Sequence, residues 1–267
     1  MISIEEYKIV ESLEEAYKLN QSRSNQIIGG MCWVKMQNKS VHTAIDMSNL
    51  GLDTIEEFDD CFKIGAMTTL RALETNERIM EFFGNGISES LCHIVGVQFR
   101  NCATVGASVF MRFPFSDVVT ALLALDAQVQ LHQKGIVSLE DFAKMPFDRD
   151  ILTHIILKKQ NIKMKYLSLR NSYTDFPVLA VAVSQTENGV QACVGARPQR
   201  AELVKDQGNI LANGITKETA KEFAEFAANA LSFGTNPRGS AEYRKHLCKV
   251  LVCRGLLALN GDDENEN

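Results

Sequence analysis

Short strand-like and helix-like patterns alternate along the whole chain, and this alternation limits the fold to a mixed α+β class. A helical pattern over residues 13–20 is followed by a strand pattern over residues 26–28, which stops at Gly29-Gly30. A second strand pattern covers residues 42–46. This spacing is β-α-β-like, so we expect a small α+β unit at the N-terminal end.

The next stretch of the chain continues the alternation. Residues 61–66 alternate as a strand, and Thr68 or Thr69 then caps a predicted helix. One face of this helix carries Leu70, Leu73, Met80 and Phe83. Ser116 is a good N-cap for a further helix over residues 117–125.

The amino-acid composition of the chain changes near residues 158–163, which are polar and basic. Beyond this break, two strand patterns over residues 177–184 and 190–196 flank the pair Asn188-Gly189. An Asn-Gly pair favours a type I′ turn, so these strands are predicted to form a hairpin.

Two predicted helices close the chain, one over residues 216–231 and one from Ser240 onward. The expected inner face of the first helix consists of Phe223, Phe226, Ala227, Ala230 and Leu231. That of the second helix consists of Leu247, Val250, Leu251 and Leu257. The tail, residues 261–267, is acidic and holds no core-forming residue, so we expect it to be disordered. The sequence therefore predicts two α+β modules joined near residue 160.

Charge and composition exclude several classes of protein. The chain has 28 Lys and Arg against 33 Asp and Glu, a formal charge of −5, and no basic stripe that would favour nucleic acid. Its longest apolar stretch, residues 118–125, is too short to span a membrane, and no secretory signal is visible. Seven scattered cysteines indicate reduced thiols, most of them buried, in a cytoplasmic protein.

The usual motifs of catalysis are missing from the sequence. It contains no P-loop, no G-x-G-x-x-G fingerprint, no HExxH and no G-x-S-x-G elbow. The five histidines are far apart, and the cysteines lack the spacing of a zinc or iron–sulfur site. We therefore predict no catalytic side chain and no metal ligand in this chain.

Two glycine-containing segments are the best candidates for a binding site. The first is residues 27–33 (IIGGMCW), and the second is residues 100–108 (RNCATVGAS). Glycine lets a backbone approach a diphosphate closely and adopt a positive φ, and a following helix N-terminus favours negative charge. Either segment alone is more often a plain turn, so the context has to decide.

That context is the order of four runs: residues 65–70 (GAMTTL), 100–108, 116–127 (SDVVTALLALDA) and 236–244 (NPRGSAEYR). In this order they resemble the FAD-binding subunit of molybdenum hydroxylases, the xanthine dehydrogenase and carbon monoxide dehydrogenase medium-chain family. The resemblance covers essentially residues 1–258.

The resemblance implies a fold and a domain layout. It implies a two-lobed FAD-binding domain of the vanillyl-alcohol-oxidase type (PCMH-type) over residues 1–158, with lobes at about 1–55 and 56–158. A smaller α+β domain of the CO dehydrogenase flavoprotein type would cover residues 163–260.

The resemblance also implies the residues that hold FAD. They are Ile27, Ile28, Gly29, Gly30, Met31, Cys32, Trp33, Ala103, Thr104, Gly106, Ala107 and Ser108 around the diphosphate and ribityl chain, Asp117 near the flavin nucleotide, and Ile151 and Leu152 against the isoalloxazine. Asp117 also has a plain structural interpretation, as an acid in the first turn of a helix. We expect Cys32 to be an inert thiol, because Lys35 is its only basic neighbour in sequence.

The family function implied is electron transfer within a multi-subunit oxidoreductase. A molybdopterin-binding subunit would oxidise the substrate, an iron–sulfur subunit with 2Fe–2S clusters would pass electrons on, and FAD in this chain would reduce NAD⁺ or another acceptor. By this interpretation the chain is not active on the substrate alone. A stand-alone flavin reductase fits less well, because the C-terminal module matches the hydroxylase type.

Departures from the family pattern leave a second hypothesis open. Met31 and Cys32 stand where the family has a hydroxyl and a carboxylate, and Ala107 and Ser108 replace a glycine and a longer amide. Losing two or three hydrogen bonds would weaken FAD by roughly one to three orders of magnitude. The alternative is a scaffold subunit of the same complex with weakened or lost FAD binding.

Overall fold

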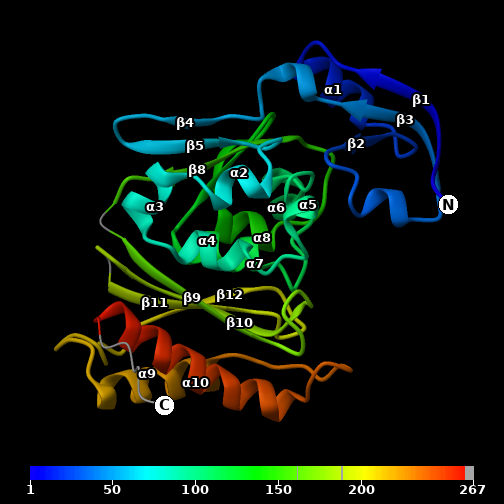
Figure 1. Cartoon of the computed structure of the whole chain (residues 1–267). Helices are drawn as coiled ribbons and strands as arrows, with labels where there is room; N and C mark the ends of the chain where they lie inside the picture. The colour runs from blue at the N-terminus through cyan, green and yellow to red at the C-terminus, as the bar shows by residue number, and fades with distance from the viewer. Residues whose placement is uncertain (161, 188, 262–267) are drawn as a thin grey trace. The chain divides into compact units, whose positions relative to one another are not determined.

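The computed structural model describes residues 1–160, 162–187 and 189–261, which form two compact units (Figure 1). The first compact unit contains residues 1–73, 97–111 and 127–158, and the second contains residues 74–96, 112–126 and those from 159 onward. Segments from different parts of the sequence thus share a unit, and the predicted domain limits at 158 and 163 stay a prediction. Apart from Gly261, the predicted acidic tail lies outside the described residues.

A small parallel sheet with a helix opens the first compact unit. Strands β1 (Ser3–Ile9), β3 (Ser40–Asp46) and β2 (Gln26–Ile28) pair in the order β1-β3-β2. Helix α1 (Leu13–Asn20) begins where Ser12 accepts a hydrogen bond from the Glu15 amide. Val10, Ala16, Ile45, Met47, Leu52 and Ile151 form the core of this region. The predicted β-α-β spacing is confirmed, with β1 as a strand that the sequence pattern did not indicate.

A five-stranded antiparallel sheet is the second sheet of the first compact unit. Its order is β4-β5-β8-β6-β7. The bounds are β4 (Ile55–Glu57), β5 (Cys61–Gly65), β6 (Gln128–Leu131), β7 (Gly135–Ser138) and β8 (Leu152–Lys158). Short helices α5 (Val97–Arg100), α6 (Val105–Phe110) and α8 (Leu139–Lys144) and the 3-10 turns η1 (Val34–Met36) and η2 (Ser48–Leu50) belong to the same unit.

The prediction of a single helix that carries Leu70, Leu73, Met80 and Phe83 is wrong. The chain forms two helices instead, α2 (Leu70–Glu74) and α3 (Glu77–Phe83). The break has a local cause, because the Asn76 side chain accepts a hydrogen bond from the Ile79 amide at 2.9 Å and starts a new helix.

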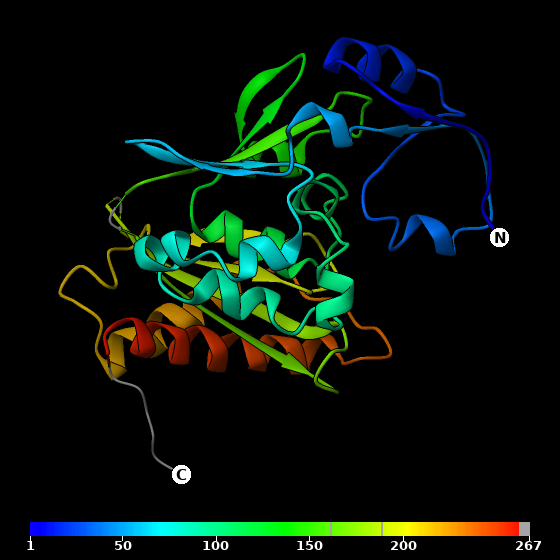
Figure 2. The same ribbon diagram turned by 45° about the horizontal axis from the view of Figure 1, so that its top comes forward.

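The second compact unit is a sheet with helices on both faces. The antiparallel order is β12-β11-β10-β9, with β9 (Lys163–Arg170), β10 (Pro177–Thr186), β11 (Gly189–Gly195) and β12 (Glu202–Lys205). Helices α9 (Lys217–Ala230) and α10 (Ala241–Leu259) lie along one face, and α4 (Gly86–Leu91) and α7 (Asp117–Ala124) along the other (Figures 1 and 2). The predicted hairpin is confirmed by the pairing of Thr186 with Gly189, whereas the turn type depends on Asn188, outside the described residues.

The inner face of α9 differs in part from the expectation. Phe223, Ala227 and Leu231 are buried, but Phe226 and Ala230 are exposed. The other buried positions on this helix are Ala220, Ala224 and Ala228. Small alanines rather than the second phenylalanine therefore face α10 and the sheet, which lets the layers pack closely. On α10, Val250 is only half-buried, whereas Leu247, Leu251 and Leu257 are buried as expected.

The run at residues 236–244 owes its pattern to a buried arginine. Arg244 has no exposed side-chain surface. Its guanidinium donates to the carbonyl oxygens of Val178 at 2.8 Å and Gly234 at 2.7 Å, to the Gly239 carbonyl, and to Asn236 Oδ1. This side chain ties the start of α10 to β10 and to the preceding loop.

Two kinds of feature are absent from the described residues, a membrane-spanning helix and a metal-ligand cluster. None of the described helices is long and apolar enough to cross a membrane. No group of three or more His, Cys, Asp or Glu side chains in the described part of the chain is placed to hold a metal ion.

Candidate functional site

The two glycine-containing segments meet in the first compact unit. A Cβ atom placed on Gly30 would lie 1.6 Å from the Cys102 carbonyl oxygen, and one on Gly29 would lie 2.9 Å from Thr104 Oγ1. Only glycine permits this approach at position 30, because the opposing atoms are backbone. The turn after β2 and the segment that leads into α6 are therefore packed in direct contact, although they are about 70 residues apart in sequence.

The backbone amides of the first turn are free to bind a ligand. Among the described residues, the amides of Gly30, Met31 and Cys32 find no hydrogen-bond acceptor. Met31 has a φ of 59°, which is uncommon for a residue other than glycine. Successive amides around a left-handed residue form a concave nest that binds anions. The positive φ expected at the glycines is thus found at Met31, and the glycines serve close packing.

The second segment uses most of its own amides internally. The Val105 amide donates to the Thr68 carbonyl at 2.9 Å, and the Gly106 amide donates to the Ala66 carbonyl at 2.8 Å. Thr104 caps α6 by accepting from the Ala107 amide at 3.4 Å. A Cβ on Gly106 would lie 2.5 Å from Ala66 Cβ, so this glycine also serves packing. The donors available to an anion therefore belong mainly to the first turn.

The side chains around these turns are mostly apolar or already engaged. Ile28 and Ala103 are buried, Ile27 packs into the core beside Ile45, and Trp33 is 45% exposed. Ala107 is exposed. The Ser108 hydroxyl donates to the Thr104 carbonyl at 3.0 Å.

The thiol of Cys32 is half-buried, and its surroundings raise its pKa. Burial, and secondarily the neighbouring Cys102, raise the pKa of the Cys32 thiol, while Lys35 lowers it less. A raised pKa reduces the thiolate fraction at neutral pH, and the inertness expected of Cys32 stays a prediction. All seven cysteines are free thiols, but only Cys193 and Cys248 are buried, so the expectation that most are buried is wrong.

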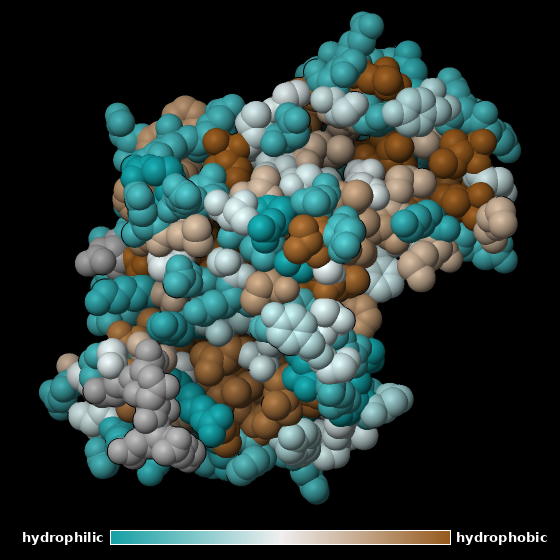
Figure 3. Space-filling view, viewed as in Figure 1, coloured by the Kyte–Doolittle hydropathy of each residue, from teal (hydrophilic) through white to brown (hydrophobic). Residues whose placement is uncertain are grey.

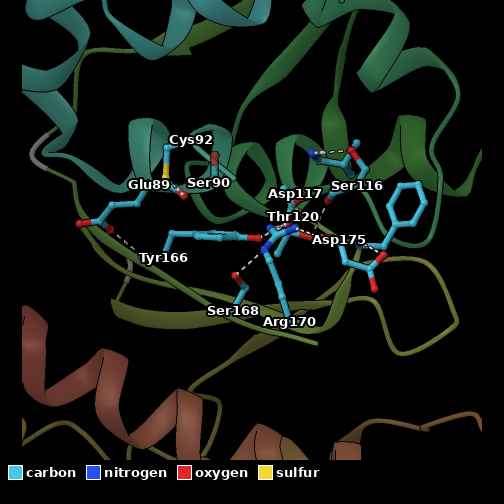
Figure 4. Close-up of polar contacts among 12 residues, drawn as sticks. Glu89, Ser90, Cys92, Ser116, Asp117, Thr120, Tyr166, Ser168, Arg170 and Asp175 are labelled. Atoms are coloured by element: carbon cyan, nitrogen blue, oxygen red, sulfur yellow. Dashed lines mark hydrogen bonds and ion pairs between the residues drawn. The ribbon is translucent and has the colours of Figure 1, made fainter. Parts of the chain in front are cut away.

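Asp117 lies in the second compact unit, at the first turn of α7. Its carboxylate accepts hydrogen bonds from the Tyr166 hydroxyl and, at 2.6 Å, from Arg170 Nη2 (Figure 4). Burial raises the pKa of the Asp117 carboxyl, and the Arg170 charge opposes this shift. Arg170 also donates to the Asp175 carbonyl at 2.7 Å and to Ser168 Oγ at 3.2 Å. The carboxylate thus has internal partners that account for its burial.

Sequence reasoning missed Tyr166 and Arg170. The available signal was the period-two spacing of Tyr166, Ser168 and Arg170 on one face of β9. Figure 4 shows these three side chains on the side of the strand that faces α7. Polar side chains at alternate positions along one face of a strand indicate a buried polar partner opposite them.

The pair expected to contact a flavin ring lies in the first compact unit. Ile151 is 1% exposed and packs into the core beside Val10 and Ile45. Leu152 is 5% exposed and begins β8. Both side chains are therefore part of the protein interior, and their contact with a flavin stays a prediction.

The comparisons with known proteins agree with this architecture. Residues 3–161 match the family described as the FAD binding domain in molybdopterin dehydrogenase, and residues 166–259 match the CO dehydrogenase flavoprotein C-terminal domain. Protein YgfM of Escherichia coli K12 is 26% identical over 93% of this chain and 94% of its own length. The nicotine 6-hydroxylase medium subunit of Paenarthrobacter nicotinovorans is 24% identical over 92% of this chain and 94% of its own length.

A solved structure shares the fold over nearly the whole chain. The structure of carbon monoxide dehydrogenase from Hydrogenophaga pseudoflava contains a chain that matches with a TM-score of 0.87 and 20% identity, covering 98% of this chain and 99% of that one. The predicted fold class, a two-lobed FAD-binding fold followed by a smaller α+β domain, is confirmed.

Proposed function

Because this chain belongs to the family of FAD-binding domains of molybdopterin dehydrogenases, we propose that it is the FAD-carrying electron-transfer subunit of a multi-subunit molybdenum hydroxylase or dehydrogenase. The family makes the chain an oxidoreductase subunit. When bound, FAD supplies the exchange between single electrons from 2Fe–2S clusters in a partner and a two-electron acceptor such as NAD⁺. We place this activity in the cytoplasm, as the reduced cysteines suggest.

One observation carries the proposal, the turn at Gly30, Met31 and Cys32. A diphosphate bears negative charge on several oxygens, and three consecutive amides around a left-handed residue suit such a group. Hydrogen bonds from amides to a charged oxygen are worth about 1.5–3 kcal/mol each. These amides bind without any help from side chains, so the loss of the family's hydroxyl and carboxylate at Met31 and Cys32 does not remove them.

Exposed apolar residues in the first compact unit support the proposal of partner chains. Tyr7 is 57% exposed, Trp33 45% and Met36 74%. Figure 3 shows apolar side chains gathered over the small parallel sheet and η1. Such surface is typical of a chain that works within an assembly. We propose an iron–sulfur subunit and a molybdopterin-binding subunit as the partners, because the relatives of this chain include medium subunits of such oxidoreductases.

The experiment is purification of the assembled complex under gentle conditions, followed by denaturation and measurement of released FAD. The proposal predicts an amount of FAD equimolar with this chain, together with molybdenum and iron in the partner chains. An absorbance spectrum without flavin bands, in a complex that takes up no flavin when excess FAD is added, would overturn it. Reduction of NAD⁺ by the complex, compared with an artificial dye, would identify the acceptor.

A scaffold role is the second candidate function, and specific contacts favour it. The amides of Val105 and Gly106 are engaged within the protein, and Asp117 is held by Tyr166 and Arg170. A weakened site would release FAD on dilution. Adding excess FAD to flavin-depleted complex distinguishes the two, because a scaffold would take up no flavin whereas a weak carrier would regain activity.

A further inference from the structure

Two cysteines from distant parts of the sequence lie around one backbone carbonyl in the first compact unit. Cys32 Sγ lies 4.0 Å from the Phe99 carbonyl oxygen, and the Cys102 amide donates to the same oxygen at 3.0 Å. The contact between Gly30 and the Cys102 carbonyl holds the two turns together at this point. Both thiols are free.

The electrostatics of the pair indicate the same proximity. A charge on Cys102 opposes ionisation of Cys32, which together with burial raises the pKa of the Cys32 thiol. Cys102 is exposed, whereas Cys32 is half-buried. An exposed thiol is the one that an oxidant reaches first, and a sheltered neighbour is suited to resolve the product.

We propose that Cys32 and Cys102 form a reversible disulfide that joins the two turns when the protein meets a peroxide. The Cys102 thiolate attacks hydrogen peroxide, which yields a sulfenic acid on Cys102 and releases hydroxide. Cys32 then loses its proton and attacks the Cys102 sulfur as a thiolate, so a disulfide forms and the displaced hydroxide takes up a proton and leaves as water. Overall two thiols are oxidised by two electrons, and one peroxide is reduced to two waters.

The disulfide would act directly on the proposed anion-binding turn. Cys32 supplies one of the three free amides of that turn, and Cys102 belongs to the segment packed against it. A covalent link would stop the two segments from separating, so we expect it to slow the release of bound FAD. This consequence depends on the proposed function, whereas formation of the disulfide does not.

The test uses the full chain with four variants: Cys32→Ser, Cys102→Ser, and the controls Cys61→Ser and Cys92→Ser, which alter other half-buried thiols. Each protein is treated with hydrogen peroxide, alkylated, and digested without reduction for mass spectrometry. The wild-type chain and both controls should yield a peptide pair linked through residues 32 and 102. In Cys32→Ser, a dimedone adduct should accumulate on Cys102 because no thiol resolves the sulfenic acid.

Two results would overturn the proposal. One is oxidation of wild-type Cys102 to the sulfinic acid as fast as in Cys32→Ser, and the other is linkage of Cys102 to a different cysteine. Circular dichroism of each serine variant checks that it is folded before treatment. FAD release is measured separately, so a linked pair that releases FAD at the rate of the unlinked protein would refute the proposed effect on the flavin and leave the disulfide in place.

Discussion

Replacing Gly30 by alanine should separate the two turns of the candidate site. The new Cβ would lie 1.6 Å from the Cys102 carbonyl oxygen and 2.3 Å from its carbonyl carbon. To reach the 3.0 Å below which real Cβ contacts essentially do not occur, the segments must move apart by about 1.4 Å. Backbone atoms cannot rotate away, so the movement has to come from the turns themselves.

The size of this movement sets the expected effects. Hydrogen bonds hold only over donor–acceptor distances of about 2.7–3.2 Å, so a shift of about 1.4 Å breaks bonds from the amides of Gly30, Met31 and Cys32 to a fixed diphosphate. Loss of even one such bond, worth about 1.5–3 kcal/mol, raises the dissociation constant of FAD by about 10- to 150-fold. The overpacking itself should lower the free energy of unfolding by about 1–3 kcal/mol.

The assay is a fluorescence titration of flavin-depleted full chain with FAD, run where circular dichroism shows each variant to be folded. Gly29→Ala should be milder, because its Cβ meets the Thr104 side chain at 2.9 Å and that side chain can move. Gly208→Ala is the matched control, since its Cβ would make an ordinary contact of 3.6 Å with Ile210. Unchanged FAD affinity in Gly30→Ala, or equal losses in all three variants, would show that the contact between the two turns does not shape the FAD site.

Three further substitutions test the fold and its electrostatics. Arg244→Lys leaves buried carbonyls without donors and should lower the free energy of unfolding, measured in urea, by about 3 kcal/mol or more. The control Arg254→Lys, on the exposed side of α10, should change it by less than about 0.5 kcal/mol. Equal effects of the two substitutions would contradict this prediction. Asp117→Asn leaves the buried Arg170 cation uncompensated and should lower the free energy of unfolding by about 3–5 kcal/mol, with or without FAD. A loss of FAD affinity without a loss of stability would instead favour a direct contact between Asp117 and the flavin nucleotide. Burial, and secondarily Lys63, lower the pKa of His154 from 6.5 to about 4, so the unfolded chain takes up a proton first as the pH falls. Stability should therefore fall between pH 6.5 and 4 by about 1–2 kcal/mol after allowance for solvent screening, and His154→Gln should remove this part of the pH dependence; an unchanged profile would contradict it.

The sequence predicted the helices whose starting points are set by a side-chain cap close in sequence. Ser116 caps α7 and Thr216 caps α9 through their side-chain oxygens, so both helices begin where the capping rule places them. Strand β1 was missed because it is exposed on nearly all of its length and carries charged residues, so it lacks the alternating pattern of a half-buried strand. The break at Asn76 was missed because the apolar spacing continues across it.

In the candidate site, features set by neighbouring residues could be predicted from the sequence, whereas features set by residues distant in sequence could not. The two glycine segments could be singled out from the sequence, because glycine at a strand end is a visible signal. The left-handed conformation of Met31 could not, since it depends on packing between segments distant in sequence. The partners of Asp117 follow 49 and 53 residues later, Tyr166 and Arg170, and only the folded chain brings them to that carboxylate.

The proposed diphosphate-binding turn is tested most directly by titrating the isotope-labelled full chain with FAD and monitoring the backbone amide chemical shifts by NMR. If these amides donate to the diphosphate as proposed, the signals of Gly30, Met31 and Cys32 shift strongly and together as FAD binds. FAD binding that leaves these three amides unchanged would contradict the proposal.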